Sequence, residues 1–402
     1  MICCPLAGRL LVSCNKECLM NLKNTLYDVL LNRVPYIFEY IEKDIEFVKE
    51  KGLLPPFGST DTFSKYYSEY LEVIIQELIK STQNNLRLVG KTHISDNEIE
   101  SLVRKEIPNT IGYINHAEYL SLFNFMFFGK KTLYFDNQLV EHLAYTKLDA
   151  PSELIIPPFE SCLFVYSSPL AIKALFNLGK NRPDIDLETP ISVFIANRPC
   201  DEGLRKLIFT CWQANTKSTN IFVKRELLVR KDWTIDTMLK TDWRDIYKDF
   251  SENEILYDES IFYEAGLLFF HILINSILYL GSNDPDIISV LSNRPKFIQE
   301  LETLKSPGKI KDLNRKIKAT SALDFNLVGK STGAITVRKP SGYENNELSL
   351  KIKLKGKRFI VRGHWRRQHY GEGSITTRLT WIRPYFKGPE LAQLINKPYN
   401  VK

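Results

Sequence analysis

The stretch AGLLFFHILINSILYL, residues 265–280, is apolar except for His271, Asn275 and Ser276. A membrane-spanning helix needs about 20 consecutive apolar residues, and this run is shorter, so we expect a buried core helix from about Glu259 to Leu280. A buried imidazole must be hydrogen-bonded, and we expect His271 to satisfy a buried polar partner. The stretch therefore predicts a folded core and no membrane partner.

The sequence before this helix predicts strands, and together they form an expected central α+β domain, residues 130–304. Three short segments rich in β-branched and aromatic residues are separated by polar turns, as in an antiparallel meander. They are SVFIA (192–196), KLIFTCW (206–212) and NIFVKRELLV (220–229). A short helix is expected at about 234–239. The expected fold class is α+β, with an N-terminal helical region, a central antiparallel sheet with a long buried helix, and a C-terminal basic β-rich module.

The N-terminal region, residues 20–129, is expected to be helical. Apolar residues recur there at helical spacing, and Pro35 is placed to open a second helix. A further helix is expected at 61–80, and Ser95 with Glu98 forms a capping box before another. The aromatic segment 113–128 is expected to pack in a core. The apolar series that predicts the first two helices is Leu26, Leu30, Val34, Ile37, Phe38, Ile41 and Ile45.

The composition is that of a folded protein with two or three domains. The chain has 402 residues, of which 44% are hydrophobic and 25% charged, so it has enough apolar surface for real cores. Seven cysteines occur, but no Cys/His spacing matches a zinc site. Cys162, Cys200 and Cys211 lie in apolar contexts typical of free thiols. We therefore expect a cytoplasmic protein that uses no metal or cofactor.

The charge is distributed unevenly along the chain. Residues 305–402 contain 22 Lys and Arg against 6 Asp and Glu, a net charge of +16, so residues 1–304 carry −9. A strongly basic C-terminal part suggests a polyanionic partner. We interpret residues 305–346 as a basic connector and residues 347–402 as the basic β-rich module. Its first segment, ELSLKIKLKGKRFIV (347–361), predicts a half-buried strand whose lysines line the outer face or protect a sheet edge.

Cationic and aromatic side chains interleave in FIVRGHWRRQHYGEG (359–373) and LTWIRPYFKGPE (379–390). Arginine binds phosphates and stacks on bases, and aromatic rings stack on unpaired bases, so this mixture is typical of an RNA-binding surface. The alternative is a twisted hairpin with its tryptophans in the core and its arginines solvated. The candidate nucleic-acid-binding residues are Arg362, His364, Trp365, Arg366, Arg367, Tyr370, Arg378, Trp381, Arg383 and Lys387.

Two other functions use the same stretch. A metal-independent ribonuclease needs a general base, a general acid and a cation near the phosphate, and His364, His369 and Glu372 are the residues that would supply this chemistry. However, two histidines five residues apart on a strand point to opposite faces. A protein that maintains a phage or plasmid by binding duplex DNA is the other alternative. A non-enzymatic binding protein is the favoured interpretation.

The C-terminal stretch resembles a family found on phages and plasmids. Its members carry an R-G-H-W motif, then an aromatic residue before a glycine turn, then a W-x-x-P segment. These correspond here to Arg362-Gly363-His364-Trp365, Tyr370-Gly371 and Trp381-Ile382-Arg383-Pro384. Residues 273–287 also resemble that family's helix with a P-D-I turn, and the resemblance covers roughly residues 130–390. The matching middle segment, 132–166, contributes Tyr134, Phe135, Leu139, Leu143, Pro158, Cys162 and Tyr166.

The resemblance implies a protein of a bacterial host cell that is encoded by a mobile element. One branch of the family is an anti-CRISPR protein against the type V-A effector nuclease, which lowers effector production by acting on its message during translation. The resemblance therefore implies RNA as a partner, with a protein or nascent peptide held by the central domain. This chain departs from the family pattern L-P-x-W-C-x-Y, because Ser161 precedes Cys162 where a Trp is usual.

The first 19 residues differ from the rest of the chain, and we predict that translation starts at Met20. Lys16-Glu17 is encodable as AAGGAG, a bacterial ribosome-binding sequence, and it lies just ahead of Met20. The lipoprotein-like box ending at Cys14 follows too short an apolar stretch for a secretory signal. Mass spectrometry of the native protein should therefore detect no peptides from residues 9–16, and their detection would disprove this start.

Overall fold

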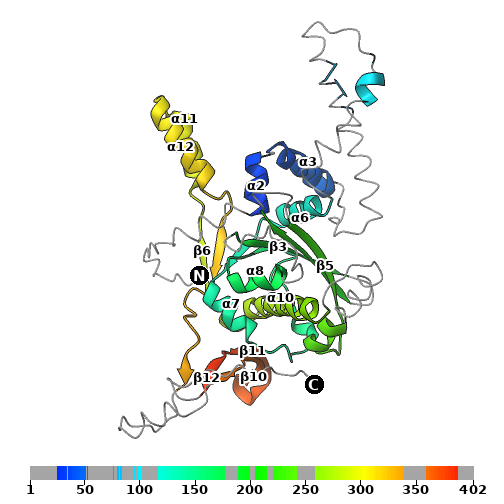
Figure 1. Cartoon of the computed structure of the whole chain (residues 1–402), viewed down its shortest axis with the longest axis vertical. Helices are drawn as coiled ribbons and strands as arrows, with labels where there is room; N and C mark the ends of the chain where they lie inside the picture. Colours follow the sequence, from blue (N-terminus) through cyan, green and yellow to red (C-terminus); the bar gives the residue numbers. More distant parts are fainter. Residues whose placement is uncertain are drawn as a thin grey trace.

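The computed structural model describes residues 25–33, 35–50, 116–176, 189–199, 204–214, 221–241, 259–338 and 359–387, with a few residues between 52 and 101. The leader at 1–19, most of the helix expected at 61–80 and the lysine-rich segment 347–358 lie outside the described residues. The described elements form four layers: N-terminal helices, a sheet, a second group of helices, and the C-terminal strands (Figure 1).

A seven-stranded sheet lies at the centre of the molecule, in the order β5-β4-β3-β2-β1-β7-β6. The three strands predicted as an antiparallel meander are confirmed as β3, β4 and β5. The whole sheet is mixed rather than antiparallel, because β1 pairs in parallel with both β2 and β7. The strands are β1 (Thr132–Phe135), β2 (Ser161–Tyr166), β3 (Ile191–Pro199), β4 (Arg205–Gln213), β5 (Ile221–Val229), β6 (Ile287–Val290) and β7 (Phe325–Val328).

The parallel pair has a local cause in the sequence. Asp136 caps helix α7 (Asn137–Ala144) by accepting a hydrogen bond from the Gln138 amide at 2.9 Å. The helix and the loop after it carry the chain back along the sheet, so β2 runs in the same direction as β1. The sequence interpretation missed this crossover because β1 is four residues long and does not stand out as a strand.

The sheet is covered on both faces, and its middle strands are apolar throughout. In β2 every residue is buried. Cys162, Phe164 and Tyr166 pack on one face with α7, α8 (Pro169–Phe176) and α10 (Glu259–Leu280), and Leu163 and Val165 pack on the other. A strand buried on both faces loses the usual polar alternation, which is why β2 is a continuous apolar run.

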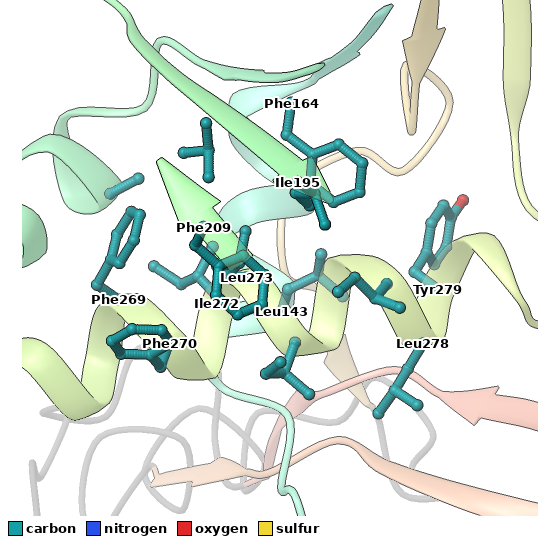
Figure 2. Packing of buried hydrophobic residues seen from close by; sticks show 14 of the residues in the cluster. Leu143, Phe164, Ile195, Phe209, Phe269, Phe270, Ile272, Leu273, Leu278 and Tyr279 are labelled. Carbon is teal, nitrogen blue, oxygen red and sulfur yellow. The ribbon is translucent and has the colours of Figure 1, made fainter. Parts of the chain in front are cut away.

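Helix α10 is confirmed as the long buried helix. Figure 2 shows its aromatic and aliphatic side chains packed against the sheet, and the rings of Phe270 and Phe209 meet edge to face with centroids 5.9 Å apart. Leu278 points in the opposite direction, toward the C-terminal strands. Among the described helices, α10 included, none has the combination of length and apolar character that a membrane crossing requires.

The N-terminal helices cover the second face of the sheet. They are α2 (Leu26–Arg33), α3 (Tyr36–Glu50) and α6 (His116–Phe127). The predicted helical region is confirmed in these elements, and α3 begins directly after Pro35 as expected. The capping box is confirmed too, since the Ser95 amide donates to Glu98 at 2.9 Å and the Glu98 amide donates back to the Ser95 hydroxyl at 3.3 Å.

Residues 305–346, interpreted above as a basic connector, contain a helix and a strand in their first part. Residues 307–319 form helix α12 (Pro307–Ala319), which packs on α11 (Arg294–Thr303), and β7 is a strand of the central sheet. Ile310, Leu313 and Ile317 give α12 a helical apolar side, but the lysines between them obscured this periodicity. The central fold therefore extends past residue 304.

The C-terminal residues form short strands, as predicted for a β-rich module. Strands β10 (His364–Tyr370) and β11 (Thr376–Ile382) make an antiparallel hairpin. A separate three-stranded sheet has the order β8-β12-β9, with β8 at Val337–Arg338, β9 at Phe359–Val361 and β12 at Tyr385–Lys387. The hairpin lies beneath α10, on the side away from the central sheet (Figure 1).

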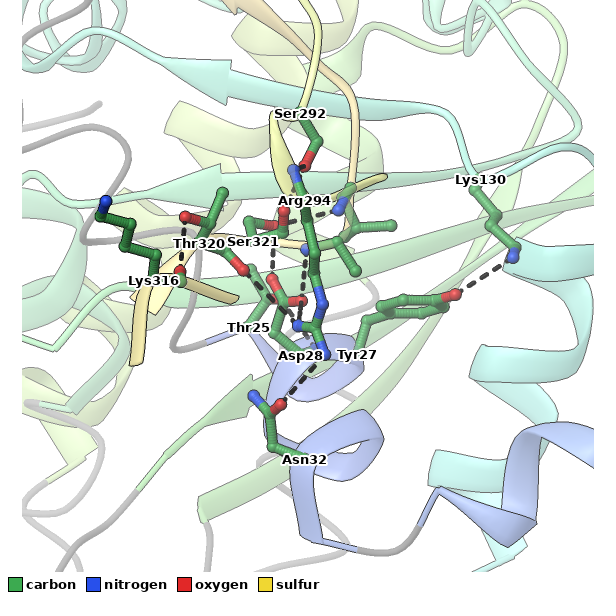
Figure 3. A network of polar contacts seen from close by, with 12 residues as sticks. Thr25, Tyr27, Asp28, Asn32, Lys130, Ser292, Arg294, Lys316, Thr320 and Ser321 are labelled. Atoms are coloured by element: carbon green, nitrogen blue, oxygen red, sulfur yellow. Dashed lines mark hydrogen bonds and ion pairs between the residues drawn. The ribbon is translucent and has the colours of Figure 1, made fainter. Parts of the chain in front are cut away.

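A buried carboxylate joins α2 to the start of α11 (Figure 3). Asp28 is fully buried and accepts hydrogen bonds from the Ala322 amide, at 2.7 Å, and from the Ser321 hydroxyl. The Arg294 guanidinium lies 3.7 Å from it and also donates to Asn32 at 3.2 Å. Burial raises the pKa of the Asp28 carboxyl, and the hydrogen bonds and Arg294 oppose this shift.

We expect Asp28→Ala to lower the free energy of unfolding by about 3–5 kcal/mol, because it leaves the Arg294 charge and the Ala322 amide buried without their partner. Urea unfolding followed by circular dichroism measures this loss. The control is Asp236→Ala, which breaks an exposed pair with Lys240 (2.8 Å) and should cost no more than about 1 kcal/mol. Equal losses in the two variants would contradict a special role for the buried carboxylate.

Candidate functional site

The β10–β11 hairpin sorts the interleaved cations and aromatic residues onto two faces. Trp365 pairs across the strands with Trp381, and Arg366 pairs with Thr380. Adjacent residues of a strand point to opposite faces, so Arg366 faces away from Trp365. The inner face, toward α10, carries Trp365, Arg367, His369, Leu379 and Trp381. The outer face carries His364, Arg366, Gln368, Tyr370 and Arg378.

The two tryptophans of the inner face fix the hairpin to the body of the protein. Trp365 is buried, and its indole Nε1–H donates to the Asn275 side-chain oxygen at 2.7 Å. Trp381 is partly buried and donates to the Thr146 hydroxyl at 3.1 Å. Their rings stack with centroids 6.2 Å apart, and Trp381 also meets the Tyr279 ring edge to face at 5.3 Å. Both tryptophans therefore brace the module and are not free to stack on bases.

Thr146, just after α7, also contacts helix α10 through its backbone carbonyl. It accepts a hydrogen bond from the Asn275 side-chain amide at 3.0 Å and another from His271 Nε2. The predicted buried partner of His271 is thus confirmed. Burial lowers the pKa of His271, and the nearby Arg362 charge acts in the same direction, so the ring is neutral and donates through Nε2.

Gly363 of the R-G-H-W motif lies against the same residue. Its amide donates to the Tyr145 carbonyl at 3.0 Å, and its carbonyl accepts from the Lys147 amide at 2.8 Å. A β-carbon at this position would lie 2.7 Å from the Thr146 hydroxyl and 2.8 Å from the Ile382 carbonyl. Only glycine allows the two backbones to approach this closely.

The outer face is the part of the hairpin that is open to a partner. His364, Arg366 and Tyr370 are exposed, and Gln368 and Arg378 are half-buried. The Arg378 guanidinium lies over the Tyr370 ring, 5.2 Å from its centroid, and Arg366 donates to Gln368 at 2.9 Å. The face thus presents two cations beside an aromatic ring, the combination that binds both phosphate and an unpaired base.

The other predicted cations lie around the hairpin. Arg362 and Lys387 are exposed. Arg367 forms an exposed ion pair with Glu153 at 2.7 Å, and Arg383 lies over the Trp381 ring, 5.6 Å from its centroid. Arg367 and Arg383 thus contact side chains of the protein, and Arg362 and Lys387 lie outside the β10–β11 hairpin. The candidate residues that lie close together are therefore those of the outer face.

The alternative catalytic set does not come together. His364 and His369 lie on opposite faces of β10, as their spacing predicted, and His369 Nδ1 lies 3.1 Å from the Ser374 carbonyl. Glu372 lies in the turn of the hairpin. Across the described residues, no group of three or more His, Cys, Asp and Glu side chains is arranged to hold a metal ion.

The residues of the middle segment that carry the family resemblance are mostly in the core. Tyr134, Phe135 and Leu143 are buried in the two faces of the sheet, and so are Cys162 and Tyr166. Burial raises the pKa of the Cys162 thiol far above its usual value, so this cysteine is inert. These positions therefore describe how the sheet packs rather than where a partner binds.

The fold and the hairpin together define an α+β protein. Its basic C-terminal hairpin docks on a buried helix, and that helix packs against a mixed sheet. The sequence model of the AcrVA2-like family, described as the anti-CRISPR type V subtype A2 family, matches residues 133–387. This match spans well over half of the chain, from β1 to β12, and the chain belongs to that family. A comparison with curated proteins gave no match.

Sequence reasoning missed three residues that position the hairpin: Thr146, Asn275 and Glu153. Asn275 carried a signal, because an amide inside an apolar helix needs hydrogen-bond partners. Thr146 and Glu153 lie more than 200 residues before the hairpin in the sequence, and nothing local indicates that their partners are Trp381 and Arg367. Such contacts come only from the tertiary fold.

We expect Gly363→Ala to lower the free energy of unfolding by about 1–3 kcal/mol, because the added methyl group forces the hairpin away from Thr146. Tryptophan fluorescence during urea unfolding reports on this region. Gly308→Ala is the matched control: no atom lies within 4 Å of its added methyl group, and stability should stay the same or rise slightly. A Gly363→Ala protein as stable as wild type would contradict the close docking.

Proposed function

We propose that this chain is a mobile-element anti-CRISPR protein that binds RNA through the outer face of its hairpin. The single observation that carries this proposal is the group formed by the exposed Arg366 and Tyr370 and the half-buried Arg378 on a docked β-hairpin. Arginines neutralise phosphates, and an exposed tyrosine gives an unpaired base a ring on which to stack. The anti-CRISPR family supports a role against a CRISPR effector.

The RNA would be a message that is being translated, and the central domain would hold a protein or the nascent peptide. The resemblance of the R-G-H-W stretch to a branch that acts on the effector message supports this step. The charge distribution supports it too, since the strongly basic C-terminal part suits a polyanion and the acidic remainder of the chain suits a different kind of partner.

We expect Arg366→Gln/Arg378→Gln to weaken binding to a labelled single-stranded RNA oligonucleotide by roughly tenfold or more at low salt. Removing two phosphate contacts should also make the plot of log affinity against log salt less steep by about 1.4, since each contact on a single strand contributes about 0.7. Fluorescence anisotropy across a salt series measures both. Lys173→Gln/Lys231→Gln removes two exposed charges elsewhere and should change neither.

Crosslinking in the bacterial host, with the same variants, tests whether the bound RNA is a message under translation. Crosslinking of the tagged wild-type protein should enrich one message together with its nascent product, and the arginine variant should lose the message. An affinity that stays flat between low and physiological salt would refute phosphate binding. Recovery of protein partners without RNA would show that the outer face is only solvated.

A further inference from the structure

Helices α11 and α12 form an arm that extends from the body of the protein. In Figure 1 the pair lies beyond the sheet edge at β6, at the opposite end of the molecule from the C-terminal hairpin. No residue of α11 is buried, and Leu313 is the single buried residue of α12. The arm therefore contributes little to the hydrophobic core. Packing against the rest of the protein does not explain why the chain forms these two helices.

The two helices cover each other with a narrow apolar seam. Phe297 and Leu301 of α11 and Ile310 and Ile317 of α12 are half-buried, with Leu313 between them. Isolated helices of this length are marginal in water, so the seam and the attachment of the arm must hold it in place. The side of α12 opposite the seam remains in solvent.

The base of the arm is fixed in direction. Arg294, the first residue of α11, is the residue that pairs with the buried carboxylate of Asp28. After α12 ends, the Ala322 amide and the Ser321 hydroxyl donate to the same carboxylate. Both ends of the arm are thus held at one buried charge, which sets the orientation of an otherwise exposed element (Figure 3).

The solvent side of α12 carries a line of cations. Lys311, Arg315 and Lys318 are spaced four and three residues apart, so they share one helix face and are separated by about 6 and 4.5 Å along the axis. The Arg315 side chain is 81% exposed and pairs with Asp312. Among the described residues, Lys311 and Lys318 have no acidic partner. Over residues 294–319 there are eight Lys and Arg against three Asp and Glu.

We propose that the α11–α12 arm is a second RNA contact, which binds the phosphate backbone of duplex RNA through Lys311, Arg315 and Lys318. The inference rests on the proposed function in that the chain engages RNA, but it uses a different site. The hairpin at one end of the molecule would hold unpaired nucleotides. The arm at the other end would hold a base-paired region of the same transcript.

The chemistry of the arm favours duplex RNA over the other polyanions and over protein. Its cationic face has no aromatic ring on which an unpaired base would stack. Duplex RNA is recognised mostly through its shape and backbone, which a line of cations on a rigid helix matches. A protein interface normally has a buried apolar or aromatic anchor at its centre, and this face offers none.

The test is the binding of a labelled blunt-ended RNA duplex by Lys311→Gln/Lys318→Gln in the full chain. Lysine and glutamine have similar helix propensities, so α12 should persist, and circular dichroism checks this. The duplex dissociation constant should rise about tenfold, with a salt dependence less steep by about 1.8, since each of the two lost phosphate contacts on a duplex contributes about 0.9. Affinity for the single-stranded oligonucleotide should stay unchanged. Lys173→Gln/Lys231→Gln again serves as the matched control.

The outcomes separate this inference from the proposed function. If Lys311→Gln/Lys318→Gln binds the duplex as tightly as the control does, the arm is a solvated face and the inference is wrong. If the variant loses affinity for duplex and single-stranded RNA equally, the arm does not select duplex RNA and the inference is also wrong. Loss of an acidic protein partner with duplex binding intact would also overturn it. If Arg366→Gln/Arg378→Gln keeps its single-strand affinity while the arm variant loses the duplex, the hairpin proposal fails and the arm stands.

Discussion

Polar contacts around Thr146 and Asn275 hold the C-terminal hairpin on the protein: Trp381 donates to the Thr146 hydroxyl, and Trp365 donates to the Asn275 side-chain oxygen. The carbonyl oxygen of Thr146 receives hydrogen bonds from Asn275 and His271, two polar residues in a helix that is otherwise apolar. A buried amide or imidazole without partners costs about 1–3 kcal/mol or more, so α10 requires polar groups to face it. The end of α7 supplies the carbonyl, and Trp365 supplies the donor to the Asn275 oxygen. Docking of the hairpin thus completes the hydrogen bonding of the core helix.

Because the hairpin must dock in this way, two residues of the R-G-H-W motif face the body of the protein and two are exposed. Gly363 and Trp365 face the body, where one allows close approach of two backbones and the other donates into the core. Arg362 and His364 are exposed. The structure therefore assigns the side chains of the interleaved stretch to two different environments. The tryptophans belong to the packing, as the twisted-hairpin alternative expected, whereas Arg366 is exposed on the outer face.

A second buried polar group orients the opposite end of the molecule. Asp28 is a charged residue at a fully buried position, and its pKa is raised because burial outweighs the hydrogen bonds and Arg294. A buried ion pair often adds little net stability, but it specifies geometry, because the charged groups tolerate few other arrangements. Here the specified geometry is the junction of α2, α11 and the segment that follows α12. The arm and the hairpin are thus each positioned by buried polar contacts.

The sequence by itself determined the elements with strong local signals. These are the buried helix at 259–280, the three meander strands, the first helices and the capping box at Ser95, because apolar periodicity and turn chemistry are local properties. It also located the basic module and the family. It did not determine the parallel pairing of β1 with β2 and β7, or helix α12, whose apolar side was masked by lysines.

Only the tertiary structure decided which face of the hairpin is free. A strand's alternation predicts that neighbours point apart, but it does not say which side meets the core. That choice depended on Thr146 and Asn275, far away in the sequence, whose polar groups needed the two indole N–H donors. Burial of Trp365 and Trp381 then left Arg366, Tyr370 and Arg378 on the other side. Long-range hydrogen bonding, which no local pattern records, therefore selected the candidate site.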